Sequence, residues 1–122
     1  MADKNNSSVI RVEKNKNYTV MSNQHFHVTN MSLKAKGLHS LILSLPDDWD
    51  YSIAGLTSIC KESYGSIRST LDELKDLGFL EVKKYTPTKE NGGRIKYEYV
   101  VYECSKTPEV LEFKWSKTYK EE

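Results

Sequence analysis

The residue types that carry out catalysis or bind metal ions occur in this sequence of 122 residues, but their spacing favours neither activity. His25 and His27 lie two residues apart, and no cysteine or acidic residue near them completes a metal site. Cys60 and Cys104 are far apart, which is typical of reduced cysteines in a cytosolic protein. No carboxylate pair, Ser/His/Asp set or Cys/His set stands in a catalytic motif. We therefore expect a cytoplasmic protein that is not an enzyme and holds no cofactor or metal ion.

The charges that could bind a polyanion lie on either side of an acidic middle. The formal net charge is only +1, yet residues 1–40 hold six basic and two acidic residues. Residues 41–78 hold three basic and seven acidic residues, and residues 79–102 hold five basic and three acidic ones. A nucleic-acid ligand needs a local basic face rather than a basic protein, so this distribution is compatible with DNA binding. No apolar run approaches the roughly 20 residues that span a bilayer, so we expect no membrane partner.

Helical and strand-like patterns organise residues 18–103 into one domain, between an N-terminal arm (1–17) and a C-terminal tail (104–122). The expected elements are helices over 33–45, 53–60 and 64–77, followed by strands over 79–85 and 94–102. A serine precedes each of the first two helices as a cap, and apolar residues recur at helical spacing. Pro46 ends the first helix and Gly78 the third. This order predicts an α+β winged helix-turn-helix, in which three helices precede a β-hairpin wing.

The third helix divides into a buried face and an exposed face. Its inner stripe is Ile67, Leu71, Leu74 and Leu77. The exposed N-terminal half offers Ser66, Arg68 and Ser69 at the positive end of the helix dipole, which suits DNA. Tyr64 could stack on a base or sugar, or cap the second helix. Arg68 could contact a base or phosphate, or pair with Asp72 one turn further along the helix.

The wing supplies most of the other candidate DNA contacts. Its basic residues are Lys83, Lys84, Lys89, Arg94 and Lys96. Glu81, Glu90 and Glu98 dilute this charge, but the position directly after a helix-turn-helix favours phosphate contact. Lys34 and Lys36 on the first helix could also reach phosphates, although a solvated helix face explains them as well. Tyr97, Tyr99 and Phe79 alternate on the strands and are expected to pack beneath the helices.

Both ends of the chain carry strand-like runs. Residues 9–14 and 18–21 predict an N-terminal β arm, and Leu111, Phe113 and Trp115 alternate with polar residues as in a short C-terminal strand. Such strands have edges that need partners. They could pair within one chain, or between two chains in a homodimer that presents two third helices to one DNA face.

Several runs resemble the N-terminal winged helix of phage and mobile-element replication proteins, the replisome-organiser or DnaD-like helix-turn-helix proteins of Gram-positive bacteria. The most specific run is LSLPDDWDYS at 43–52, and the resemblance extends over residues 18–102. Met31–Leu38, Ser69–Leu74 and Tyr97–Tyr102 also contribute to it. The resemblance implies double-stranded DNA binding in replication initiation or transcription regulation, with a host or phage replication protein as a further partner.

A second class of function is compatible with the same residues. The fold could serve as a protein-interaction module whose acidic third helix and strand edges bind another protein, as in a phage-borne inhibitor of, or adaptor for, a host nucleic-acid enzyme. The two classes differ in the dependence of binding on salt, because only phosphate contacts release condensed counterions.

Overall fold

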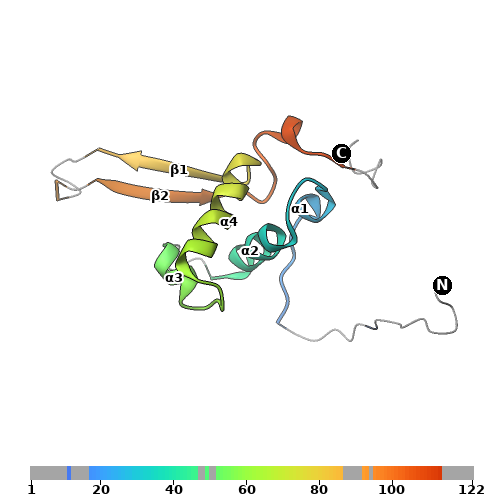
Figure 1. The fold of residues 1–122 in the computed structure, drawn as a ribbon, viewed down its shortest axis with the longest axis horizontal. Coiled ribbons are helices and arrows are strands. Elements are labelled where there is room, and N and C mark those ends of the chain that lie inside the picture. The colour runs from blue at the N-terminus through green and yellow to red at the C-terminus, as the bar shows by residue number, and fades with distance from the viewer. Residues whose placement is uncertain are drawn as a thin grey trace, which may run out of the picture.

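The computed structural model describes residues 11, 17–46, 49, 52–86, 92–93 and 95–113, apart from the side chain of Lys96. In these residues the chain is mixed α+β, and an antiparallel hairpin projects away from a group of helices (Figure 1). The elements are α1 (Gln24–His27), α2 (Leu33–Ser44), α3 (Ile53–Thr57), α4 (Tyr64–Asp76), β1 (Leu80–Tyr85), β2 (Lys96–Val101) and the 3-10 helix η2 (Pro108–Val110). No helix among the described residues is long and apolar enough to cross a bilayer.

Serine side chains begin the three longer helices. Ser32, Ser52 and Ser63 each accept a hydrogen bond from the backbone N–H three residues later, at 3.0, 2.9 and 3.2 Å. Each bond satisfies one of the N–H groups that the first helical turn leaves without a partner. The expected starts at 33, 53 and 64 are confirmed, whereas α3 ends at Thr57, three residues earlier than expected.

The core lies where α4 packs against α2, α3 and the beginning of β1. The four residues of the expected inner stripe are all buried: Ile67, Leu71 and Leu74 of α4, and Leu77 directly after it. Leu38 and Ile42 of α2 and Leu56 of α3 face them in the same cluster. Phe79, directly after α4, is fully buried, so its assignment to the core is confirmed.

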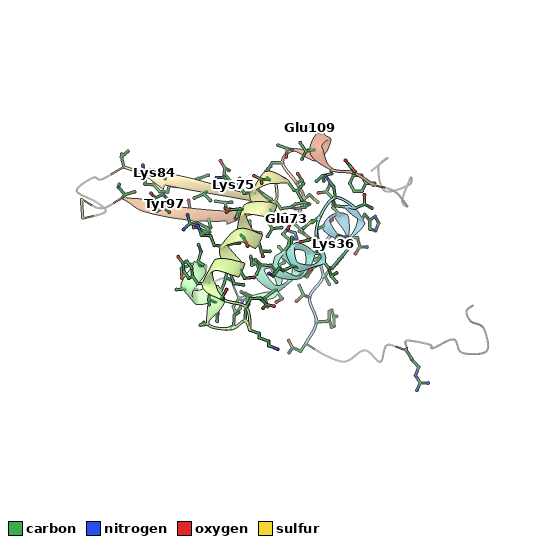
Figure 2. All side chains as sticks on the ribbon, viewed as in Figure 1. Lys36, Glu73, Lys75, Lys84, Tyr97 and Glu109 are labelled. Atoms are coloured by element: carbon green, nitrogen blue, oxygen red, sulfur yellow. The ribbon has the colours of Figure 1, made fainter. Side chains whose placement is uncertain are left out.

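The hairpin has two faces of different composition. β1 and β2 pair in antiparallel register, so alternate residues lie on opposite sides. The helix-side face carries Leu80, Val82 and Lys84 opposite Val101, Tyr99 and Tyr97. The outer face carries Glu81, Lys83 and Tyr85 opposite Val100, Glu98 and Lys96. Tyr99 is half-buried, but Tyr97 is exposed, so its assignment to the core was wrong. Tyr97 lies further along the projecting part of the hairpin, where no helix of the described chain covers it (Figure 2).

The ends of the chain depart from the expected strands. Tyr18–Val20 is exposed and forms no strand, and residues 9–14, apart from Arg11, lie outside the described residues. Residues 111–113 are also not in a strand. After the turn of η2 the chain instead meets the loop between α1 and α2, where the Glu112 carbonyl accepts a hydrogen bond from the Thr29 N–H at 2.7 Å.

The C-terminal apolar residues are covered by the chain itself. Leu111 is buried in the core and Phe113 packs against it, whereas Trp115 lies outside the described residues. The dimer expectation depended on an apolar face that needed a partner chain. That premise is wrong for Leu111 and Phe113, because a loop 80 residues earlier in the sequence supplies the partner, with the Asn30 side chain donating to the Val110 carbonyl at 3.0 Å.

Candidate nucleic-acid interface

The N-terminal half of α4 presents an open surface. Tyr64, Arg68 and Ser69 are exposed, as the sequence predicts. Between Tyr64 and Ser69 lies Gly65, and no described atom lies within 4 Å of the position that its Cβ would occupy. The Ser69 hydroxyl donates to the Ser66 carbonyl at 3.0 Å and still has lone pairs to offer a ligand. This half of α4 can therefore approach a large ligand without obstruction from its own fold.

Ser66 and Lys34 are joined on one flank of α4. The Lys34 ammonium donates a hydrogen bond to the Ser66 hydroxyl, although the two residues are 32 positions apart. Ser66 is half-buried, so it faces α2 rather than projecting into solvent as expected. The contact brings the charge of an exposed lysine to the N-terminal half of α4. Lys34 is thus placed with the candidate site, and Ser66 serves as its anchor.

Lys36 lies elsewhere. Its ammonium donates to the Phe26 carbonyl at 3.3 Å, on the side of α2 that faces α1. In Figure 2 it lies at the opposite end of the molecule from Lys84 and Tyr97 on the hairpin. The structure therefore does not bring Lys36 together with the other candidate DNA contacts.

Arg68 lies on the opposite flank of α4 from Ser66, because two residues along a helix turn the side chain through about 200°. There a groove of about 380 Å³ separates α4 from the hairpin, which we call the α4–hairpin groove. Its lining comprises Ile53 of α3, Tyr64, Arg68, Leu71, Asp72 and Lys75 of α4, and Leu80, Val82, Tyr97 and Tyr99 of the hairpin. In the described part of the chain, the Arg68 guanidinium makes no ion pair with Asp72. The ion pair between Arg68 and Asp72, which was the alternative to a DNA contact, is therefore not present in the structure.

The two hairpin lysines with described side chains lie on opposite faces of the hairpin. Lys84 is exposed on the helix-side face opposite Tyr97, whereas Lys83 is exposed on the outer face opposite Glu98. Lys89 and Arg94 lie outside the described residues. The backbone of Lys96 pairs with Tyr85 on the outer face, and its side chain is not described. Of the two hairpin lysines whose side chains the structure describes, Lys84 therefore lies on the same side of the hairpin as α4 and Lys83 does not.

Carboxylates occupy the outer face of the hairpin. The Tyr85 hydroxyl donates to Glu98 at 2.7 Å and the Tyr102 hydroxyl donates to Glu81 at 2.5 Å. These hydrogen bonds, together with burial and the nearby negative charge, raise the pKa of both tyrosines. Lys83 thus lies among acids, which reduces its contribution to a phosphate-binding field.

One acidic residue of α4 is used inside the fold. The Glu73 carboxylate accepts hydrogen bonds from the Ser32 N–H at 2.6 Å and from the Ser32 hydroxyl at 2.7 Å. Glu73 is half-buried and holds the N-terminus of α2 against α4. Asp72 and Asp76 are exposed and would repel phosphates. A duplex that approached the outward side of α4 would therefore be confined to the N-terminal half of the helix.

The structure adds one residue that sequence reasoning placed in the core. Tyr97 lines the α4–hairpin groove together with Tyr64. The alternation of residues on β2 predicts that Tyr97 shares a face with Tyr99, but it does not predict that the helices leave this part of the face uncovered.

Among the described residues, no group of three or more histidines, cysteines or acids could hold a metal ion. The surface thus offers cations, hydroxyls and aromatic rings, which suit nucleic acids.

Comparisons with protein-family models, with curated proteins and with solved structures found no match.

Proposed function

We propose that this chain is a winged helix-turn-helix domain that binds double-stranded DNA, in replication initiation or transcription regulation of a phage or mobile element. The order α2, α3, tight turn, α4 and hairpin supports the fold. In such a domain the second helix of the motif enters the major groove by its N-terminal residues, and the hairpin lies on the neighbouring backbone. The resemblance of residues 18–102 to replication proteins supports the biological setting.

The open N-terminal half of α4 is the observation that carries this proposal. Nothing in the described fold covers Gly65 or Ser69, although the opposite side of the same helix is buried in the core. The helix dipole places partial positive charge at this end, and Arg68 adds a full one. A helix whose exposed half is polar, uncovered and positive at its start is suited to a major groove about 12 Å wide.

Three cations from three elements surround this surface. Lys34 of α2 reaches one flank of α4, Arg68 lies on the other flank, and Lys84 lies on the side of the hairpin that faces α4. Phosphates on either side of a major groove would meet positive charge on both flanks of α4. This arrangement supports contacts that fix the orientation of the duplex independently of its sequence.

The matched lysines of β1 test the role of the hairpin. Lys84→Ala should reduce the slope of log affinity against log salt for random duplex DNA by about one unit, because one phosphate contact is lost. Lys83→Ala should change the slope much less, because Lys83 lies among Glu81 and Glu98 on the outer face. Fluorescence anisotropy over a salt series measures both slopes. Equal slopes for the two variants would contradict the assignment of the helix-side face to DNA.

The arginine of α4 tests the role of the helix. Arg68→Ala should weaken binding to a preferred duplex, selected from a random pool, by about 1–3 kcal/mol if the guanidinium reads a base edge. A similar loss on preferred and random duplexes would identify a phosphate contact instead. Ser58→Ala is the control, because Ser58 is exposed at the end of α3 and, among the described residues, its hydroxyl bonds only to the Gly55 carbonyl. If the unaltered protein shows no salt-dependent duplex binding, the protein-interaction module is favoured.

A further inference from the structure

Two exposed tyrosine rings lie in the α4–hairpin groove. Tyr64 of α4 is 50% exposed and Tyr97 of β2 is 56% exposed, and both line the groove. Neither ring makes an aromatic contact within the described residues. The groove between them has an apolar floor that includes Leu71, Leu80 and Val82. Flat apolar ring faces that are left open in a groove are suited to stacking against another planar group.

Positive charge surrounds these rings. Arg68 and Lys75 of α4 line the groove, and Lys84 lies directly across the strand pair from Tyr97. Figure 2 shows Lys84 and Tyr97 together on the projecting hairpin, with Lys75 on α4. Asp72 is the one acid in the lining formed by the described residues. The groove therefore combines a net positive rim with aromatic faces, which complements a ligand that has phosphates and exposed planar bases.

We propose that the α4–hairpin groove binds unpaired nucleotides of single-stranded DNA. Bases stack on Tyr64 and Tyr97, while Arg68, Lys75 and Lys84 contact the phosphates that link them. Single-strand binding proteins combine a cationic groove with aromatic platforms in this way, because every base has a π-face and every linkage a charge. The proposal deepens the proposed function, since it rests on the same DNA-binding domain and adds a second form of DNA at an adjacent surface.

A duplex cannot use this groove in the same manner. Inside a duplex each base is stacked on its neighbours, so its faces are unavailable to a tyrosine unless the base is extruded at a cost of a few kcal/mol. The duplex would instead meet Gly65 and Ser69 on the outward side of α4. The two ligands share Arg68 and Lys84, but they are separable at Tyr97, which lies on the hairpin in the groove, and at Ser69, which lies on the exposed helix surface.

The experiment compares two tyrosines of the hairpin. Tyr97→Ala removes a ring from the helix-side face, and Tyr85→Ala removes a ring of similar exposure, 45%, from the outer face. Binding of a fluorescent oligothymidine of about twelve nucleotides is measured by anisotropy at low salt. Tyr97→Ala should weaken binding at least about fivefold, because stacking of one base is lost. Tyr85→Ala should stay within about twofold, as should Tyr97→Phe, which retains the ring.

The same variants are titrated with a duplex so that the two proposals can fail separately. Tyr97→Ala should leave duplex affinity within about twofold, whereas Ser69→Asp, which adds an acid to the outward side of α4, should weaken the duplex much more than the oligothymidine. Crosslinking of an oligonucleotide that carries 4-thiothymidine should label Tyr97 or Tyr64.

Equal losses for Tyr97→Ala and Tyr85→Ala, or no oligothymidine binding by the unaltered protein, would overturn the single-strand proposal. Either result would leave the duplex proposal standing if Ser69→Asp still weakens the duplex. Loss of duplex binding alone, with the Tyr97 effect intact, would overturn the proposed function and retain the groove as a single-strand site.

Discussion

Replacing Gly78 by alanine is expected to lower the free energy of unfolding by about 2–5 kcal/mol, which is a large part of the stability of a domain of this size. Gly78 has φ +85°, a conformation that costs a residue with a Cβ about 1–2 kcal/mol. A Cβ at this position would also lie 2.9 Å from the backbone nitrogen of Thr107 and still closer to the hydroxyls of Ser105 and Thr107. The Ser105 and Thr107 side chains could rotate away from the added methyl group, but the backbone nitrogen of Thr107 could not.

Gly78 is fixed from both sides, so the fold cannot relax around an added methyl group. Its N–H donates to the Lys75 carbonyl at 3.1 Å, and the Phe79 N–H donates to the Leu74 carbonyl at 2.9 Å, which is the pair of bonds that closes a Schellman helix end. The Gly78 carbonyl accepts from the Lys106 N–H at 2.8 Å. Displacing this residue would therefore disturb the end of α4 and the C-terminal segment together.

Urea or thermal unfolding followed by circular dichroism measures the effect of Gly78→Ala. Gly37→Ala is the matched control, because Gly37 lies within α2 and its Cβ would meet no described atom within 4 Å. That change should leave stability unchanged or raise it by up to about 1 kcal/mol through helix propensity. A loss of less than about 1 kcal/mol for Gly78→Ala would contradict the close packing of residues 105–107 against this position.

Acidification from about pH 7 to pH 5 is expected to lower the free energy of unfolding by about 2 kcal/mol from His25 alone, with a further loss from His39. Both rings are fully buried. Burial, followed by the charges of His39 and Lys36, lowers the pKa of His25 from 6.5 to about 4. Burial also lowers the pKa of His39, against the opposing effects of the Tyr102 carbonyl and Glu103. The unfolded chain therefore binds protons first, and stability is lost as the pH falls from 6.5 toward 4.

Hydrogen bonds place the protons of both rings. The Ser40 hydroxyl donates to the Lys36 carbonyl at 2.8 Å, so its oxygen accepts from His25 Nε2, also at 2.8 Å. His39 Nε2 donates to the Tyr102 carbonyl at 2.8 Å. The buried Nδ1 atoms of His25 and His39 have no hydrogen-bond partner among the described residues, and the two ring centroids are 4.3 Å apart. A second proton on either ring would create a buried charge without an acceptor, and protonation of both rings would place two like charges side by side.

Urea unfolding at intervals from about pH 7 to pH 5 isolates these histidines, because unperturbed carboxylic acids titrate mainly below about pH 4.5. His25→Leu has a side chain that cannot be protonated, so its stability should fall less than that of the unaltered protein over this range. Equal pH dependence of the two proteins would show that His25 is not the source, and a flat profile of the unaltered protein would contradict the neutral histidine pair.

Local signals in the sequence predict much of this fold. The serines at 32 and 52 and the glycine at 78 mark helix ends because each satisfies, or permits the closure of, backbone hydrogen bonds within a few residues. The stripe from Ile67 to Leu77 is buried because its spacing matches one helix face. The strand predicted from Leu111, Phe113 and Trp115 does not form at residues 111–113. Alternation of apolar and polar residues gives no information on which segment lies alongside, and here that segment is the loop between α1 and α2 rather than the edge of a sheet.

The candidate site is predicted only in part. Arg68 and Ser69 are exposed on α4 as expected, since helical angle alone separates them from the buried stripe. Ser66 faces Lys34, and Lys36 lies near α1, because hydrogen bonds between distant segments decide where each side chain lies. Lys83 and Lys84 are adjacent in sequence, yet the strand places them on opposite faces, one beside acids and one beside Tyr97.

The sequence by itself therefore specifies the three longer helices, the hairpin, their order and the polar character of α4, because caps, turns and apolar periodicity act over a few residues. Only the tertiary structure decides which cations share a surface, that Tyr97 is uncovered while Phe79 is buried, and that His25 and His39 meet. These features depend on packing between segments far apart in the chain. Such packing is determined by the burial of the whole apolar cluster rather than by any local pattern.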